Sequence, residues 1–186
     1  MKHLNRIALV LSLVAIGIVP VAVASPVCSL KVKAPIGTRT FAKTSDLNDW
    51  QEFQSVYELP DLSLASGMSA QFWQHKHGTP SVITVEPEQG FQIDTRYCFD
   101  EGGQLEFVSF EIRTDLGWGH RTEGTVLDGV FSETSSEFFR VKDGKAMAQP
   151  EGVSETPQSL QPKLYLSLDE LPFADLLPVQ QKMASR

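Results

Sequence analysis

The sequence predicts an α+β protein in which one or two N-terminal helices pack on an antiparallel meander sheet of about 5–7 strands, with one disulfide. Apolar residues recur every three to four positions over residues 45–73, a spacing typical of helices. From residue 80 onward apolar and polar residues alternate, as in strands with one buried face. Short Gly-containing turns join these segments with no helical segment between them, which argues against a parallel sheet.

The N-terminal leader has the three parts of a secretory signal peptide. Two basic residues stand in the first six positions, an uncharged apolar run covers 7–24, and small residues, Ala22 and Ala24, close the run. The alternative is an uncleaved membrane anchor, because about 18 apolar residues reach the lower limit for spanning a bilayer. We expect cleavage that removes residues 1–24 and places the protein in the periplasm or outside the cell.

The charge balance narrows the class of partner. The chain carries 16 basic and 23 acidic residues, a formal net charge of −7. Removing the leader takes away two basic residues and no acidic residue, so the mature chain has a formal charge of −9. That charge argues against nucleic acid as a partner, because phosphate contacts need a basic surface. We expect a soluble protein with no membrane span after cleavage, whose partner is a protein or a small-molecule ligand.

The two cysteines, Cys28 and Cys98, both lie in the mature chain. An even number of cysteines in an exported protein predicts a disulfide. This disulfide would close a loop of about 70 residues and stabilise the fold by about 4 kcal/mol in the chain-entropy model. The alternative is a reactive or metal-binding thiol, but neither residue belongs to a C-x-x-C motif or a Cys/His cluster.

The first predicted helix covers residues 45–58. Ser45 is a favourable N-cap, and the acidic residues that follow it suit the positive end of the helix dipole. The apolar positions that would form its buried side are Leu47, Trp50, Phe53, Val56 and Tyr57. A second helix is predicted over 61–73, although Gly67 weakens it. These helices are expected to cover the apolar face of the sheet.

Alternation and turn residues define the predicted strands. Two short extended segments come first, at 28–32 and 38–42. The later strands are predicted at 81–85, 91–99, 104–114, 121–127, 130–141 and 145–148. The polar run 132–137 inside one of them is typical of a sheet edge or an exposed face.

Two local signals refine this sheet. The parity of the apolar residues changes near Phe107, which predicts a β-bulge there. The dipeptides Asp128-Gly129 and Asp143-Gly144 predict two-residue type I′ hairpin turns.

The mature chain divides into three parts. Residues 25–149 are predicted to form the α+β domain, and 150–162 form a proline-rich linker or surface loop. The C-terminal segment 163–186 contains apolar residues such as Leu171 and Phe173. We expect this segment to pack back on the domain, the alternative being that it docks on a partner.

The most unusual local feature is Gly117-Trp118-Gly119-His120-Arg121. Its glycines leave Trp118 free to project, and a tryptophan beside His120 and Arg121 can stack on a sugar ring or another flat ligand. We therefore predict a ligand-binding site at Trp118, His120 and Arg121. The alternative is a tryptophan that packs over the end of the sheet.

Two alternatives involve chemistry. The first is a small secreted hydrolase with His120 as base and a carboxylate such as Asp115 or Glu123 orienting it. The second is a metal chaperone that uses His75 and His77, which share a face only on a strand. The sequence contains no G-x-S-x-G, P-loop or H-E-x-x-H motif and no third clustered metal ligand. We therefore expect no cofactor and favour a non-catalytic, exported cell-envelope protein that binds a ligand or partner.

Overall fold

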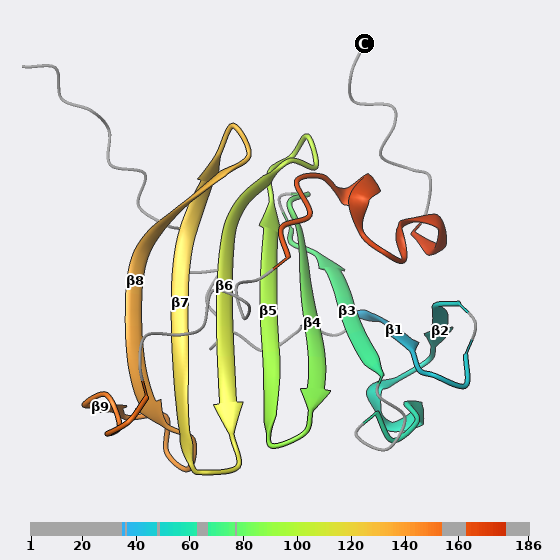
Figure 1. Ribbon diagram of the computed structural model, residues 1–186. Helices are drawn as coiled ribbons and strands as arrows, with labels where there is room; N and C mark the ends of the chain where they lie inside the picture. Colours follow the sequence, from blue (N-terminus) through green and yellow to red (C-terminus); the bar gives the residue numbers. More distant parts are fainter. Residues whose placement is uncertain are drawn as a thin grey trace, which may run out of the picture.

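The computed structural model describes residues 35, 37–47, 49–62, 67–76, 78–153 and 163–177. These residues form one nine-stranded antiparallel sheet with the order β2-β1-β3-β4-β5-β6-β7-β8-β9 (Figure 1). The strands are β1 Arg39–Lys43, β2 Gln51–Phe53, β3 Met68–Gln74, β4 Pro80–Glu88, β5 Phe91–Phe99, β6 Leu105–Thr114, β7 Trp118–Leu127, β8 Val130–Arg140 and β9 Ala146–Met147. From β3 onward each strand pairs with the next one along the chain, so the predicted antiparallel meander is confirmed.

The predicted α+β class is wrong, because the described residues contain no helix of seven or more residues. Their only helical elements are three short 3-10 turns, η2 Val56–Glu58, η4 Leu168–Glu170 and η5 Ala174–Leu176. The sheet also has nine strands where about five to seven were expected. The described residues therefore form a single sheet whose apolar face is covered by irregular chain.

The segment predicted as the first helix forms a turn, the short strand β2 and the turn η2. Phe53 pairs with Thr40 of β1, so backbone hydrogen bonds that a helix would make within itself go to a neighbouring strand. Trp50 is held by a tertiary contact, since its ring lies 5.1 Å from the ring of Phe173. Tertiary contacts have overridden the helical spacing of the apolar residues.

The second predicted helix is also wrong, because its C-terminal half is strand β3. Ala70 and Phe72 face one side of the sheet and Ser69 and Trp73 face the other, and all four are buried. A strand buried on both faces shows no clean alternation of apolar and polar residues. Its apolar residues therefore mimic a helical spacing.

The strands after residue 90 lie close to their predicted positions. β5 has the predicted bounds, and β6 and β8 each differ from the prediction by one residue at one end. Cys98 pairs with Phe107 while Phe99 pairs with Leu105, so one extra residue is inserted in β6. The predicted β-bulge near Phe107 is confirmed.

The two predicted hairpin turns have different outcomes. Asp128 and Gly129 have φ angles of 51° and 76°, as a type I′ turn requires, so this prediction is confirmed. At the second position only Gly144 has a positive φ. The chain instead closes a longer loop, in which the Arg140 amide donates to the Lys145 carbonyl. The type I′ prediction for Asp143-Gly144 is wrong.

The polar run 132–137 lies on β8, near one side of the sheet. β9 follows β8 but pairs only with Phe138 and Phe139, so the rest of the outer side of β8 is an edge of the described sheet. The prediction that this run marks an edge or an exposed face is confirmed.

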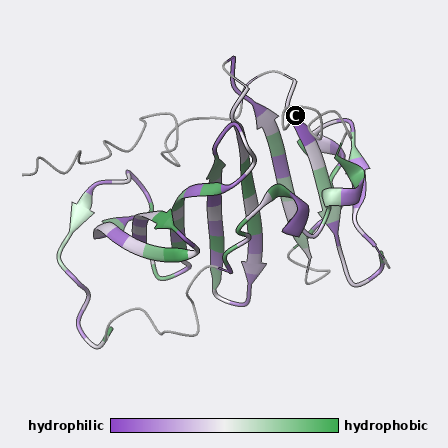
Figure 2. Ribbon diagram, turned by 90° about the horizontal axis from the view of Figure 1, so that it is seen from above, coloured by the Kyte–Doolittle hydropathy of each residue, from purple (hydrophilic) through white to green (hydrophobic). Residues whose placement is uncertain are grey.

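Alternation along the strands divides the sheet into two faces (Figure 2). We call the face that carries Phe41, Phe72, Val82, Tyr97 and Val108 the apolar face. Its core side chains pack against Tyr165, Leu171 and Phe173 of the C-terminal segment. Burying each of these side chains contributes about 1.5–3 kcal/mol.

The C-terminal segment, residues 163–177, takes the place that was expected for a helix. It lies across one end of the sheet beside β3 and β4 and is drawn in red in Figure 1. The ring of Phe173 stacks on Phe41 at 4.8 Å, and Tyr165 meets Tyr97 edge-on at 5.4 Å. The Leu105 amide also donates to the Leu166 carbonyl, so backbone bonds fix the segment to β6.

Several predictions concern residues outside the described part of the chain. The leader 1–24, the extended segment 28–32 and most of the linker 150–162 lie there. Cys98 is the only cysteine among the described residues and is not free; its predicted partner, Cys28, lies outside them, so the described residues contain no complete disulfide. Within the described ranges no helix is long and apolar enough to cross a membrane.

Candidate functional site

A cleft of about 370 Å³ opens between the apolar face and the C-terminal segment. Its volume falls within the range of about 300–1,000 Å³ that small-molecule sites occupy. The residues that line it are Lys43, Thr44, Ser45, Trp50, Gly67, Met68, Glu86, Pro87, Glu88, Tyr165 and Pro172.

Three neighbouring strands provide the floor of the cleft. Lys43 of β1 pairs with Met68 of β3, and the next pair along β3 is Ser69 with Val85 of β4. Continuing that register places Glu86 beside Met68 on the same face. The floor of the cleft therefore consists of the Lys43 ammonium group, the Met68 thioether and the Glu86 carboxylate, side by side on three strands.

Two aromatic side chains border the cleft from different segments. Trp50 comes from the chain between β1 and β2 and is held against Phe173. Tyr165 comes from the C-terminal segment and is held against Tyr97. Because both rings are fixed by core residues, they are positioned before any ligand arrives.

Burial and a neighbouring carboxylate disfavour the charged form of Glu86 in the cleft. Burial raises the pKa of Glu86, and the like charge of Glu88 raises it further, while Lys163 acts in the opposite direction. Burial, together with the charge of Glu86, raises the pKa of Tyr165. With Lys43 in the lining and Lys163 near Glu86, two cations balance two carboxylates, so the cleft favours no net charge in a ligand.

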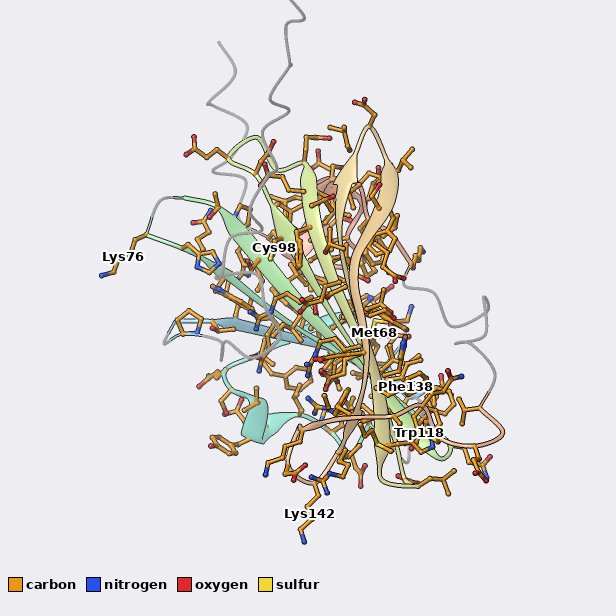
Figure 3. The ribbon with its side chains drawn as sticks, turned by 90° about the vertical axis from the view of Figure 1, so that its left-hand side faces the viewer. Met68, Lys76, Cys98, Trp118, Phe138 and Lys142 are labelled. Carbon is orange, nitrogen blue, oxygen red and sulfur yellow. The ribbon has the colours of Figure 1, made fainter. Side chains whose placement is uncertain are left out.

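The structure separates the three residues of the predicted ligand site. Trp118 and His120 lie on one face of β7, where their rings are 5.9 Å and 4.5 Å from the ring of Phe138. Trp118 and Phe138 lie together near the β9 end of the sheet (Figure 3). Arg121 lies on the opposite face. A ligand that stacks on Trp118 would therefore not reach Arg121.

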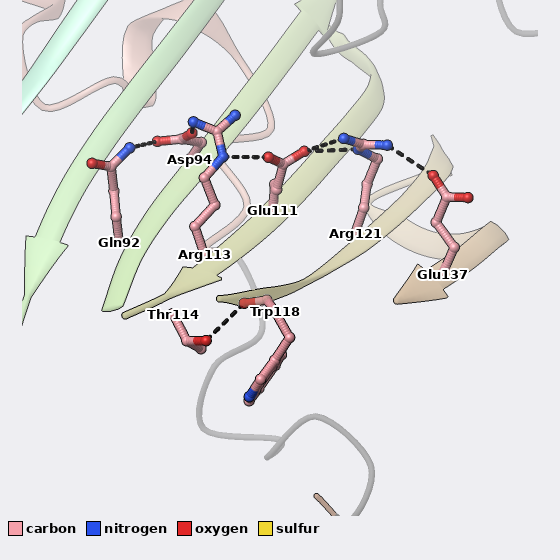
Figure 4. Close-up of polar contacts among 8 residues, drawn as sticks. All are labelled: Gln92, Asp94, Glu111, Arg113, Thr114, Trp118, Arg121 and Glu137. Carbon is pink, nitrogen blue, oxygen red and sulfur yellow. Dashed lines mark hydrogen bonds and ion pairs between the residues drawn. The ribbon is translucent and has the colours of Figure 1, made fainter. Parts of the chain in front are cut away.

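Arg121 belongs to a row of ion pairs that we call the charge ladder (Figure 4). Its Nε and Nη2 atoms donate to Glu111 at 2.8 and 2.5 Å, and its Nη1 atom donates to Glu137 at 2.8 Å. Arg113 donates to the other oxygen of Glu111 at 2.5 Å and lies 3.2 Å from Asp94. The ladder crosses β5 to β8, and its contacts assign Arg121 a structural role.

His120 has a hydroxyl partner rather than the predicted acids. Its Nε2 atom lies 2.9 Å from the Ser136 hydroxyl oxygen, and burial lowers its pKa, which favours the neutral ring at neutral pH. Glu123 faces the other side of the sheet, where it accepts hydrogen bonds from Ser109 and Ser135. Asp115 lies in the exposed turn before β7.

The metal alternative loses support within the described residues. The ring Nε2 atom of His75 lies 2.9 Å from the Ser81 hydroxyl oxygen, and His77 lies outside the described part of the chain. No group of three or more His, Cys, Asp or Glu residues that could hold a metal ion is found in the part that is described.

Sequence reasoning missed the cleft. Lys43, Trp50, Glu86 and Tyr165 come from four segments that the fold brings together, and no local motif links them. The one available signal was Trp50, an aromatic residue between short polar stretches, which was assigned to a helix. Comparisons with protein-family models, curated sequences and solved structures found no match to this chain.

Proposed function

We propose that the protein is a non-catalytic binding protein of the cell envelope and that its cleft takes a short, uncharged saccharide. The observation that carries this proposal is the composition of the cleft. Two fixed aromatic rings, Trp50 and Tyr165, border a floor that offers both hydrogen-bond donors and acceptors.

The chemistry of a sugar matches both the aromatic rings that border the cleft and the hydrogen-bonding groups of its floor. A sugar ring presents C–H groups on its face, which pack against an aromatic ring, and hydroxyl groups around its edge. Glu86 and Glu88 can accept hydrogen bonds from hydroxyls, and the Lys43 ammonium can donate one. Hydrogen bonds to charged groups are about twice as strong as neutral ones. The balanced charges favour an uncharged ligand over an ion.

The predicted export supports this proposal, because an exported protein meets the glycans of the cell envelope. It remains a prediction from residues 1–24, and its own test is the mass of the protein recovered from the culture medium and from cell fractions. A mass that still includes the leader would contradict cleavage.

The binding test uses the mature chain, residues 25–186, and a panel of neutral oligosaccharides on an array, followed by titration calorimetry on each hit. We expect at least one neutral oligosaccharide to bind. Trp50→Ala and the isosteric Glu86→Gln should each weaken that binding about tenfold, or about 1.4 kcal/mol. Circular dichroism checks that both variants fold.

The matched control is Trp118→Ala, which removes a half-exposed tryptophan outside the cleft. It should leave the affinity unchanged. The proposal is wrong if no oligosaccharide binds, or if Trp118→Ala weakens binding while Trp50→Ala does not. The second result would favour the ligand site first predicted from the sequence.

A second candidate function is ester hydrolysis at the Ser136–His120 pair, favoured by their 2.9 Å contact. Neutral His120, with its proton on Nδ1, would take the Ser136 hydroxyl proton at Nε2 as the oxygen attacks the ester carbonyl. Cleavage of the ester C–O bond passes that proton to the leaving alcohol, and water then releases the acid from the serine. An alkyl fluorophosphonate should label the wild type but not Ser136→Ala. An unlabelled wild type would exclude this candidate.

A further inference from the structure

We propose that the outer side of β8 over residues 130–137, which we call the open edge, binds an extended basic segment of a partner protein as an added strand. This inference concerns a surface remote from the cleft and does not depend on the saccharide proposal.

The backbone pairing of β8 is one-sided along most of its length. Its inner side pairs with β7 from Val130 to Arg140. On its outer side β9 pairs only with Phe138 and Phe139, so the described sheet provides no neighbouring strand for residues 130–137. Figure 3 looks onto this side of the molecule. A strand with one unpaired side presents N–H and C=O groups that can hydrogen-bond to another extended chain.

The acidic charge of the hairpin formed by β7 and β8 favours a basic partner segment. No lysine or arginine occurs from Thr122 to Phe139, whereas this stretch contains four acidic residues, Glu123, Asp128, Glu133 and Glu137. All residues from 132 to 137 are exposed. Many edge strands carry lysines that discourage pairing, but this edge carries only acidic charge. It therefore repels acidic segments and attracts basic ones.

The same charge argues against a second copy of this chain as the occupant. Two β8 strands side by side would bring together two edges that each carry only acidic charge, Glu133 and Glu137 in each copy. Like charges on adjacent strands are destabilising. A basic strand removes that repulsion.

The tip of the hairpin adds an apolar contact. Leu127 and Val130 pair across the type I′ turn, yet they are 75% and 64% exposed. Two such side chains next to each other offer a place for one apolar residue of a partner. The partner segment should therefore combine basic residues with an apolar residue at one end.

A second β-bulge limits the length of the pairing. Glu123 pairs with Ser135 and Gly124 with Glu133, so Thr134 is the inserted residue in β8. Bulges interrupt regular pairing along an edge. We therefore expect the added strand to pair along residues 130–133, where Glu133 provides the acidic charge.

The test uses two fluorescent ten-residue peptides on the mature protein, one alternating valine with lysine and one alternating valine with glutamate. Anisotropy should show binding of the lysine peptide and none of the glutamate peptide, and the binding should weaken with added salt. Glu133→Lys should weaken the lysine peptide about tenfold. Asp46→Lys, at an exposed turn after β1 on the opposite side of the sheet from β8, makes the same change in net charge and should have little effect.

Amide hydrogen exchange locates the contact. Added lysine peptide should slow exchange within residues 130–137 of the folded wild type. Equal weakening by Glu133→Lys and Asp46→Lys, or no change in exchange on β8, would overturn the proposal, because binding would then follow net charge alone. A stable dimer with slowed exchange on β8 in the absence of peptide would overturn it in favour of self-association.

Discussion

Glu111→Ala is expected to be one of the most destabilising single changes in this protein. The Glu111 side chain is only 1% exposed and lies between two arginines of the charge ladder. Both of its oxygens accept hydrogen bonds, one from Arg113 and one from Arg121. Truncation removes every one of these contacts at once.

The expected cost follows from the burial of the partners. The Arg113 side chain is 44% exposed, so it can rotate towards the solvent when Glu111 is removed. The Arg121 side chain is only 9% exposed and would keep Glu137 as its remaining partner within the ladder. Removing one member of a buried ion pair costs about 3–5 kcal/mol. The matched control is Glu137→Ala, which also removes a partner of Arg121 but is 43% exposed. A pair that exposed contributes about 0–1 kcal/mol.

Urea unfolding of residues 25–186, followed by circular dichroism, measures the difference. With an m-value of about 2 kcal/mol/M, Glu111→Ala should lower the midpoint by about 2 M and Glu137→Ala by at most about 0.5 M. Adding Arg121→Met to Glu111→Ala should recover part of the loss, because the buried cation is removed. Equal effects of the two alanine variants would refute the argument from burial.

Three further predictions concern packing and pH. Gly119→Ala would place a Cβ against the Phe139 ring and 2.7 Å from the Ile112 carbonyl oxygen, and should lower the melting temperature by several degrees in a thermal scan. Phe173→Ala removes a buried ring of the core and should cost about 3–5 kcal/mol, which urea unfolding will show. The raised pKa of Glu86 means that its contribution to stability is greatest below the ordinary glutamate range and declines as pH rises through the raised value. Melting temperatures should therefore show Glu86→Gln close to wild type at pH 4 and more stable than wild type at pH 7.5.

The sheet from residue 80 onward was predictable because its pairing is local. Each strand pairs with the next, so alternation within one segment and the turn that follows it contain most of the information. The bulge in β6 was visible for the same reason, since the change of parity near Phe107 lies within one strand.

The N-terminal part was not predictable by this reasoning because β3 pairs with β1 and not with the preceding strand, β2. β1 lies between β2 and β3, so the short β2 forms only where β1 is already placed. Trp50 and Phe53 have a helical spacing, but their contacts are with the C-terminal segment and with β1. Local periodicity contains no information about those distant contacts.

The candidate site was likewise only partly predictable from the sequence. Trp118 and His120 stood out because glycines flank the tryptophan, and the structure does place them together. The predicted strand begins at Arg121, whereas β7 begins at Trp118, and alternation along β7 sends Arg121 to the face opposite Trp118 and His120. The cleft joins Lys43 and Tyr165, which are far apart in the sequence, so only the tertiary fold shows it.

The position of the C-terminal segment has a consequence for the order of folding during synthesis. Chains are made from the N-terminus, so all nine strands leave the ribosome before residues 163–177 do. Until that moment Phe41 and Tyr97 lack the rings of Phe173 and Tyr165 that cover them. A nascent chain in which residues 163–177 have not yet emerged therefore still exposes an apolar surface that chaperones can bind, and the native core closes only after this segment emerges.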